Sequence, residues 1–576
     1  MRTRQYGRAI SQRASEYFEM SGRAEFVAAA FLFALMLAFK IVNAATYVFD
    51  SDESQHLHVI WGWANGFVQY RDVCDNHMPL FQIIFTPIYK LIGERATILY
   101  WMRFILLPMY FVVMWCTYRI GALCFSRRAG VWAVIVAGFY PGYHFCSMEF
   151  RTDNLWAPLW LLTLVVLLSG AVTFRRSLLA GLLLGLCFGI SMKSVLLLLS
   201  ILTSGAFLLA FLGAEKSGLR PAHLARCVAV FLAGAAFVPG AIMLAFALGG
   251  VWGPFRYWVF QNNILPQFRN HPAWWIVLFP LLFPLVIYLG RALIQQTPDP
   301  VRAARRGFIF FIWGFYILAL WSFWSLVSRQ DYLPYHPLAF VLYSPVILVV
   351  SVHFLEPRRG LHAIFRRVPL PAFVAAVEFL TTLIAHPFWV DGAKNETDLL
   401  RATLKLTARG DFVLDEKGET VFRQRCFAPI WEPCVMERIR RGLMADNAAQ
   451  RCFETRTCVA VTGKEMSLAA NRFVLQHYLP VGNRLRVAGT LLRPAPDDEK
   501  RSDFEVVIPA SYSIMTPNGN ITGFLDGEPY RGGRFLAPGK HTFLRSSGTT
   551  ELALLWTQAA DRGFTPFHSL TPEPKN

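Results

Sequence analysis

Long apolar segments alternate with short polar ones over the first two thirds of the chain. Many apolar segments approach the roughly 20 residues that an α-helix needs to cross a bilayer. We therefore predict a polytopic α-helical membrane protein with about 11–13 transmembrane helices. The predicted spans are residues 25–49, 97–123, 129–148, 155–172, 177–192, 194–213, 226–249, 273–291, 307–328, 335–355 and 369–389. Residues 79–95 are too short and interrupted for a clear assignment, and are either interfacial or half of an extra hairpin.

The pattern changes at about residue 392, where the long apolar segments stop and charged residues become frequent. Residues 395–410 and 432–453 have apolar positions at helical spacing. Three later segments alternate in the manner of short strands, at residues 503–520, 539–547 and 550–558. We expect a soluble C-terminal domain that is α+β first and then a small β-sandwich.

The distribution of charge orients these segments. The chain has 56 Lys and Arg against 38 Asp and Glu, and its arginines gather in short clusters between apolar segments. Such clusters are typical of cytoplasmic loops under the positive-inside rule, so the charge favours membrane lipids over nucleic acid as a partner. We expect a cytoplasmic N-terminal segment at residues 1–24, a transmembrane domain at 25–391 and an extracytoplasmic domain at 392–576.

A dense polar cluster follows the first predicted span, at residues 48–82. It opens on Asp52 and Glu53, and a Gly-containing break separates its two halves. The second half contains Tyr70, Arg71, Asp72, Asp75 and His77. One acidic pair at the end of a span is ordinarily interfacial, because carboxylates are excluded from hydrocarbon. The density of polar groups in this cluster favours a functional site instead.

The histidines of the cluster raise the question of a metal. His56, His58 and His77, with the neighbouring carboxylates, are of the residue types that bind a divalent cation. Their spacing matches no metal motif that we can justify. A divalent cation and a metal-free site both stay open, and the sequence identifies no cofactor with certainty.

Other charged residues fall on the same predicted face of the membrane. Arg151 and Asp153 stand at the start of a predicted span, where they form either a helix cap and ion pair or a functional acid with its partner. Lys193 lies between two apolar segments and either snorkels to the interface or binds a phosphate. Arg329, close to Tyr332 in a compact turn, suits a phosphate. Because the charge bias places these groups on one face, we expect one site.

Missing motifs narrow the chemistry. The chain has no GxxxxGK[ST] loop, no GxGxxG after a predicted strand, and no GxSxG nucleophile elbow in a strand–turn–helix context. We therefore do not expect nucleotide-driven chemistry in the membrane part of the protein. A group transfer outside the cytoplasm needs a donor delivered in the membrane, such as a polyprenyl-phosphate sugar.

Four segments, taken in order, resemble the C-type (GT-C) membrane glycosyltransferases of the protein-mannosyltransferase and lipid A aminoarabinose-transferase kind. They are "DSDESQHLHVIWGWANGFVQYRDVCDNHMPL", "FRTDN", "MKSVLLLL" and "DYLPYHPL". The resemblance covers roughly residues 25–350 and implies a GT-C-like fold in the cytoplasmic membrane of a bacterium. The chain differs from the aminoarabinose-type enzymes at residues 76–79, where Asn–His–Met–Pro replaces Glu–Lys–Pro–Pro.

The resemblance implies an inverting transfer of a sugar from a polyprenyl-phosphate-linked donor to an acceptor hydroxyl at the outer face. The acceptor is a glycolipid, lipopolysaccharide, polysaccharide or protein. Asp52 matches the catalytic carboxylate of the family and Asp153 its later acidic residue. Lys193 and Arg329 are the expected phosphate partners. The other expected substrate-binding residues are Glu53, Tyr70, Arg71, Asp72, Asp75, His77, Arg151 and Tyr332.

Two other classes of protein remain as alternatives. A secondary transporter or flippase of a lipid-linked or anionic substrate also has many spans and buried charges, although the sequence shows no repeat pair of broken helices. A scaffold protein would use the C-terminal domain for recognition. Four cysteines of that domain would form one or two disulfides in an oxidising compartment, or stay as buried thiols. They are Cys426, Cys434, Cys452 and Cys458.

Overall fold

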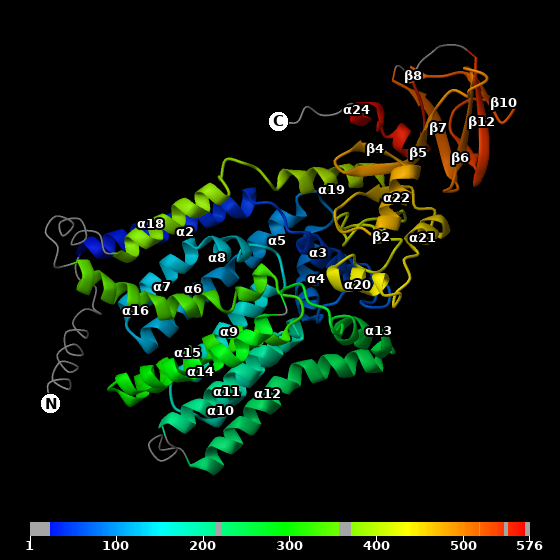
Figure 1. The fold of residues 1–576 in the computed structure, drawn as a ribbon. Helices are drawn as coiled ribbons and strands as arrows, with labels where there is room; N and C mark the ends of the chain where they lie inside the picture. The colour runs from blue at the N-terminus through cyan, green and yellow to red at the C-terminus, as the bar shows by residue number, and fades with distance from the viewer. Residues whose placement is uncertain are drawn as a thin grey trace. The chain divides into compact units, whose positions relative to one another are not determined.

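The chain folds into two compact units in a computed structural model. The structure describes residues 23–212, 220–272, 274–355, 370–517, 519–546 and 551–570, so most of the predicted N-terminal segment lies outside the described residues. The first unit, here the helical unit, comprises residues 1–48, 76–81 and 100–392. The second, here the mixed unit, comprises residues 49–75, 82–99 and 393–576. Figure 1 shows the course of the chain through these elements.

The helical unit contains a helix at each predicted span. Its main helices are α2 (Arg23–Thr46), α5 (Ile98–Leu106), α6 (Pro108–Cys124), α7 (Arg127–Phe139), α8 (Pro141–Cys146), α9 (Asp153–Leu168), α10 (Phe174–Ile190), α11 (Ser194–Leu212), α12 (Pro221–Leu248), α13 (Trp252–Arg256), α14 (Trp275–Gln296), α15 (Pro300–Phe323), α16 (His336–Leu355) and α18 (Leu370–Ala385). Among the described residues, six helices are long and apolar enough to cross a membrane: Arg23–Thr46, Ile98–Cys124, Ser194–Leu212, Pro221–Leu248, Trp275–Gln296 and Pro300–Phe323. The protein is therefore an integral membrane protein, as the hydropathy pattern predicted.

Prolines and caps explain where helix ends differ from the predicted spans. The predicted span 129–148 is interrupted at Tyr140, because Pro141 opens the short helix α8. Helix α15 begins at Pro300 instead of residue 307, since the Asp299 side chain accepts a hydrogen bond from the backbone N–H of Val301. It ends at Phe323, so the last predicted residues of that span form a loop.

Glycines allow helices α10 and α12 to pack closely. A Cβ atom added to Gly181 would lie 2.2 Å from the backbone oxygen of Phe231, and one added to Gly185 would lie 2.9 Å from the backbone oxygen of Gly234. Small residues permit such close approach between membrane helices. The packing holds α10, whose C-terminal end leads directly to Lys193.

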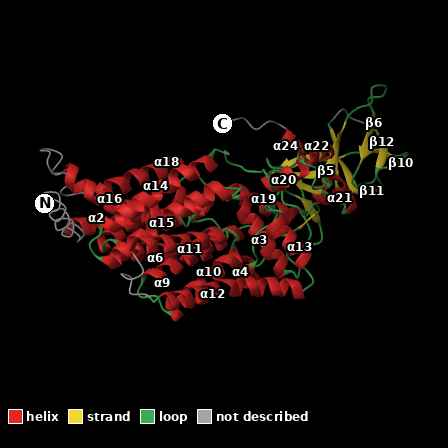
Figure 2. Ribbon diagram, turned by 60° about the horizontal axis from the view of Figure 1, so that its bottom comes forward, coloured by secondary structure: helices red, strands yellow, loops and turns green. Residues whose placement is uncertain are grey.

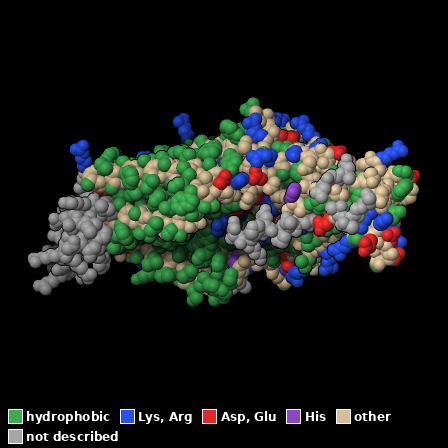
Figure 3. Space-filling model, turned by 90° about the horizontal axis from the view of Figure 1, so that it is seen from above, with side chains coloured by type: hydrophobic (Ala, Val, Ile, Leu, Met, Phe, Trp, Pro, Cys, Tyr) green, Lys and Arg blue, Asp and Glu red, His purple; other side chains and the backbone are tan. Residues whose placement is uncertain are grey.

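The surface of the helical unit is apolar where a lipid bilayer would contact it. Figure 3 shows apolar side chains gathered over the visible surface of this unit. On α14 the side chains of Val277 and Leu281 are exposed by 60% and 65%. Exposed apolar patches of this extent mark contact with a membrane or another protein.

The mixed unit begins with two helices from the N-terminal third of the chain, α3 (Ser51–Ala64) and most of α4 (Leu80–Ile92). Its other helices are α19 (Lys394–Leu406), α20 (Pro433–Arg440), α21 (Ala448–Glu454), α22 (Leu468–His477), α23 (Thr557–Asp561) and α24 (Phe567–Leu570). The first half of the polar cluster and the ambiguous segment 79–95 therefore each contain a helix. The structure does not assign either to a membrane span.

All strands of the described chain belong to the mixed unit (Figure 2). They are β1 (Phe412–Leu414), β2 (Gln424–Arg425), β3 (Val459–Val461), β4 (Tyr478–Gly482), β5 (Leu485–Leu492), β6 (Arg501–Val506), β7 (Ala510–Thr516), β8 (Gly519–Asn520), β9 (Gly523–Leu525), β10 (Glu528–Pro529), β11 (Arg534–Leu536), β12 (Gly539–Arg545) and β13 (Leu552–Trp556). The larger sheet has the order β11-β7-β13-β5-β3-β1-β2, with β4 beside β5 and β8 beside β7. The smaller sheet has the order β10-β9-β12-β6.

The two sheets share one hydrophobic core. Ile514 and Leu554 from the larger sheet and Leu525 and Phe543 from the smaller one belong to the same buried cluster. The pairs of β1 with β2 and β3 are parallel, with Val413 opposite Val459, whereas the later strands pair antiparallel. An α+β part followed by a two-sheet β part agrees with the predicted fold class.

Candidate active site

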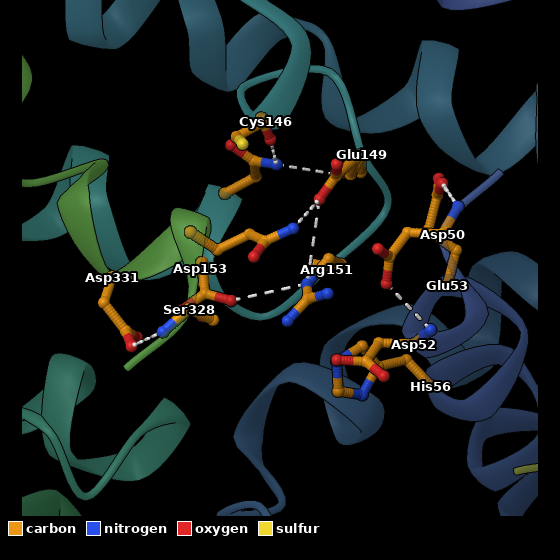
Figure 4. A network of polar contacts seen from close by, with 12 residues as sticks. Asp50, Asp52, Glu53, His56, Cys146, Glu149, Arg151, Asp153, Ser328 and Asp331 are labelled. Carbon is orange, nitrogen blue, oxygen red and sulfur yellow. Dashed lines mark hydrogen bonds and ion pairs between the residues drawn. The ribbon is translucent and has the colours of Figure 1, made fainter. Parts of the chain in front are cut away.

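Helix α3 begins with a capping box built from the acidic residues of the first polar cluster (Figure 4). The Asp50 side chain accepts a hydrogen bond from the Asp52 backbone N–H at 3.0 Å. The Glu53 carboxylate accepts one from the Asp50 backbone N–H at 2.9 Å. Glu53 is fully buried, so it has a structural contact that the sequence interpretation did not include. The arrangement leaves Asp52 as the partly exposed carboxylate of the first turn.

Lys417, in the loop after β1, contacts the Asp52 carboxylate. Its Nζ lies 3.3 Å from Asp52 Oδ1 and 2.9 Å from Glu465 Oε2. Burial lowers the pKa of Lys417, but the carboxylates of Asp52 and Glu465 outweigh burial and raise it above its usual value. The lysine is therefore charged at neutral pH. A cation and the helix N-terminus both stabilise an ionised Asp52.

A buried carboxylate, Asp415, shapes the loop that carries Lys417. It accepts hydrogen bonds from the backbone N–H groups of Gly418 and Thr420, both at 3.0 Å, and from Arg425 Nε at 2.7 Å. Gly418 has φ of +103°, and a Cβ atom there would lie 2.8 Å from the Cβ of His58 on α3. Glycine is therefore required on both steric and conformational grounds.

The second half of the polar cluster forms a tight turn. Tyr70 has φ of +73° and is buried. The Asp72 carboxylate accepts hydrogen bonds from Nε and Nη2 of Arg71, both at 2.9 Å, and from the Val68 backbone N–H. Burial raises the pKa of Tyr70, with the Asp75 carboxylate adding to the effect, so its hydroxyl stays protonated.

Asp75 is fully buried and is held by amide groups. It accepts hydrogen bonds from Gln69 Nε2 at 2.7 Å and from Gln82 Nε2 at 2.9 Å. His58, one of the histidines considered for a metal, instead has Nδ1 2.8 Å from the Val421 backbone oxygen. Burial lowers the pKa of His58. A neutral His58 that contacts a carbonyl oxygen serves the packing of α3, and the divalent cation stays a hypothesis.

In the helical unit, Arg151 lies between two carboxylates in the turn before α9 (Figure 4). Its Nε is 3.8 Å from Glu149 Oε2 and 3.6 Å from Asp153 Oδ2. Gln330 Nε2 donates to the same Glu149 oxygen at 2.8 Å. The three charged groups are buried. Buried charges of this kind require pairing, and they are expensive enough to suggest use.

Lys193 joins this turn to a short helix, η2 (Arg329–Tyr332). Its ammonium is in direct contact with the Asp331 carboxylate and lies 3.7 Å from Asp153. Asp331 is fully buried and accepts a hydrogen bond from the Ser328 backbone N–H at 2.8 Å. Both carboxylates compensate the charge of Lys193, which leaves it the weaker of the two expected phosphate partners.

Arg329 is the exposed cation of this cluster. Burial lowers the pKa of Arg329, but the Cys146, Tyr47 and Glu149 side chains outweigh burial and raise it. Tyr332, in the same short helix, accepts a hydrogen bond from Trp321 Nε1 at 2.9 Å. His77 is half-buried in a segment of the helical unit. The structure thus brings Arg151, Asp153 and Lys193 together and leaves Arg329 accessible beside them.

Comparison with known proteins agrees with this fold. A family model described as dolichyl-phosphate-mannose-protein mannosyltransferase matches residues 76–243. The crystal structure of ArnT from Cupriavidus metallidurans in the apo state superposes with a TM-score of 0.53 at 12% identity, covering 80% of this chain and 97% of that one. The chain has a GT-C fold. The expected resemblance is therefore confirmed.

A second structure similar to this chain is ArnT from the same organism bound to undecaprenyl phosphate, with a TM-score of 0.53 at 12% identity. The match covers 81% of this chain and 98% of that one. A comparison with curated protein sequences gives no match.

Several residues of the polar clusters were missed by sequence reasoning. Asp331 was not selected, although its position close to Arg329 was a signal. Lys417 is separated from Asp52 by 365 positions, and nothing in the local pattern around it indicated the contact. Gln82 lies at the start of an apolar helix, where an amide that supports a buried acid cannot be distinguished from an ordinary polar position.

Proposed function

We propose that this GT-C protein transfers a sugar from a polyprenyl-phosphate-linked donor to an acceptor hydroxyl, with inversion, at the outer face of the cytoplasmic membrane. The observation that carries the proposal is the setting of Asp52. Its carboxylate stands in the first turn of α3, is 21% exposed and is paired with Lys417. A solved structure of similar fold is bound to undecaprenyl phosphate, which supports a polyprenyl phosphate as the carrier that the donor sugar leaves.

The reaction assigns a clear task to Asp52. The acceptor oxygen attacks the anomeric carbon while the bond from that carbon to the phosphate oxygen breaks. The electron pair leaves with the phosphate, and the proton of the acceptor hydroxyl passes to Asp52 as general base. Lys417 and the helix N-terminus keep the carboxylate ionised before the proton arrives.

The departing phosphate needs a cation. Arg329 suits this role, because it is exposed and a guanidinium can bind phosphate oxygens through two hydrogen bonds. Lys193 is proposed as an auxiliary cation, held in place by Asp153 and Asp331. Asp153 thus acts on the donor through the cations that it orients. Of the other expected residues, Tyr70, Asp75, His77 and Tyr332 are proposed to shape the site.

The test is the substitution Asp52→Asn in cells that carry the gene. We expect one sugar to disappear from a lipid or envelope glycan when the gene is deleted, and the Asp52→Asn protein not to restore it, as measured by mass spectrometry. Asp50→Asn is the matched control, because asparagine caps a helix as well as aspartate does. Full restoration of the glycan by Asp52→Asn would reject Asp52 as the base. Gradient-driven uptake of a substrate by liposomes containing the protein would favour the transporter alternative.

A further inference from the structure

The mixed unit contains a polar cavity that the proposed chemistry does not use. The cavity has a volume of about 300 Å³, at the lower end of the range for small-molecule sites. Its walls come from α3, from the turn at residues 70–74, from the segment after β2 and from α21. The lining residues that matter here are Trp61, Arg71, Asp72, Phe427, Asn447 and Arg451.

Two arginines give the cavity its charge. Arg71 donates hydrogen bonds from Nε and Nη2 to Asp72. No described residue accepts a hydrogen bond from its Nη1, which can therefore donate to a ligand. Arg451 donates hydrogen bonds from Nη1 to Glu454 at 2.6 Å and from Nε to the Cys426 backbone oxygen. Its Nη2 likewise has no acceptor among the described residues. Their side chains are 57% and 46% exposed. Guanidinium groups with unused N–H donors are suited to a carboxylate or phosphate.

A third lining arginine, Arg425, serves the fold instead. Its Nε donates to Asp415, and Nη1 and Nη2 donate to the backbone oxygens of Ala428 and Pro429. The side chain is only 5% exposed. This arginine holds the wall of the cavity, and the two exposed arginines are the ones that can meet a ligand.

Beyond the arginines, the lining offers an exposed amide. Asn447 can donate and accept hydrogen bonds, as a sugar hydroxyl requires, whereas Trp61 and Phe427 are only 4% and 2% exposed and merely border the cavity. The indole Nε1 of Trp61 is buried and has no hydrogen-bond partner among the described residues. Because this atom is buried, it does not itself contact a ligand in the cavity.

Helix α3 connects the cavity to Asp52. Asp52 lies in its first turn and Trp61 in its last, and nine helical residues span about 14 Å. A group bound in the cavity is therefore too far away to be the hydroxyl that reacts. It would be a neighbouring part of the same acceptor.

We propose that this cavity binds an anionic sugar unit of the acceptor glycan, with Arg71 and Arg451 contacting its carboxylate or phosphate. The proposal rests on the proposed function, because it takes the acceptor to be a glycan whose hydroxyl reaches Asp52. It adds the chemical class of the acceptor, which the general reaction leaves open.

Direct binding tests the cavity separately from sugar transfer. Isothermal titration of the full chain in detergent would use two anionic probes, digalacturonate and glucose 6-phosphate. Their neutral counterparts are digalacturonate dimethyl ester and glucose. We expect at least one anionic probe to bind and its neutral counterpart to bind at least tenfold more weakly. Arg451→Gln and Arg71→Gln should each weaken the anionic probe by tenfold or more.

Arg440→Gln is the matched control variant. Arg440 also pairs with a glutamate three residues away on an exposed helix, and it does not line the cavity. Its binding should equal that of the unmodified chain. The circular dichroism spectra of all variants would show whether each is folded, and Arg71→Gln decides the test if Arg451→Gln is not folded.

Three results with the unmodified chain would overturn the proposal: no binding of either anionic probe, equal binding of a neutral counterpart, or inorganic phosphate binding as tightly as the sugar probes. The last result would indicate a general anion site. Asp52→Asn should bind the probes normally. An Asp52→Asn protein that still transfers sugar would reject the proposed function, whereas unchanged probe binding in the arginine variants would reject the cavity alone.

Discussion

Single residues show how the protein holds charge close to the proposed base. Lys417 contacts Asp52, and the loop that carries it contains three buried acids, Asp415, Glu416 and Glu419. Glu419 accepts a hydrogen bond from the Lys417 backbone N–H at 2.9 Å. Any change in the charge of Glu419 therefore acts on the residue next to the proposed site.

The stability of the protein should depend on pH through the ionisation of Glu419. Burial and the nearby Asp415 raise the pKa of Glu419 from 4.5 to about 7. Because the folded pKa is higher than the unfolded one, ionisation of Glu419 costs stability as the pH rises from about 4.5 through 7, up to about 3 kcal/mol. Over this range the melting temperature of the unmodified chain should fall relative to that of Glu419→Gln. An equal fall in both proteins would contradict the prediction.

At the scale of elements, close helix packing supports the charged cluster of the helical unit. Helices α10 and α12 approach through glycines, and α10 ends beside Lys193. In the mixed unit, the capping box of α3 and the glycine at position 418 hold the backbone that carries Asp52 and its partner Lys417. In each unit, backbone geometry positions the charged side chains.

Gly181→Ala tests the helix packing. The added Cβ would lie 2.2 Å from the Phe231 backbone oxygen, so α10 and α12 must separate and the melting temperature in detergent should drop by several degrees. Gly205→Ala is the control, since its Cβ meets nothing within 4 Å. Alanine favours a helix over glycine, so this variant should be as stable as the unmodified chain or slightly more. A similar loss in both variants would show that packing is not the cause.

At the scale of the whole molecule, the proposed orientation has a chemical consequence. The Sγ atoms of Cys426 and Cys452 lie 3.4 Å apart, with both thiols free in the structure. If residues 392–576 face an oxidising compartment, these two thiols should form a disulfide.

Peptide mapping of the protein after alkylation, without reduction, tests this consequence. We expect the peptides containing Cys426 and Cys452 to be linked, and Cys434 and Cys458 to be alkylated after unfolding. Cys116, inside a membrane-spanning helix, serves as a thiol that should stay reduced. Full alkylation of all four cysteines of the C-terminal domain would argue against an extracytoplasmic position.

The amino-acid sequence by itself determined the positions of the helices, because hydropathy and helix caps are local properties. It also located the polar cluster around Asp52 and supported the GT-C resemblance, since the motifs are contiguous. Only the tertiary structure decided the partners of the charges. Lys193 meets Asp331 across 138 positions, and Asp52 meets Lys417 across 365. Contacts over such separations depend on how helices and loops pack, and no periodicity along the chain encodes them.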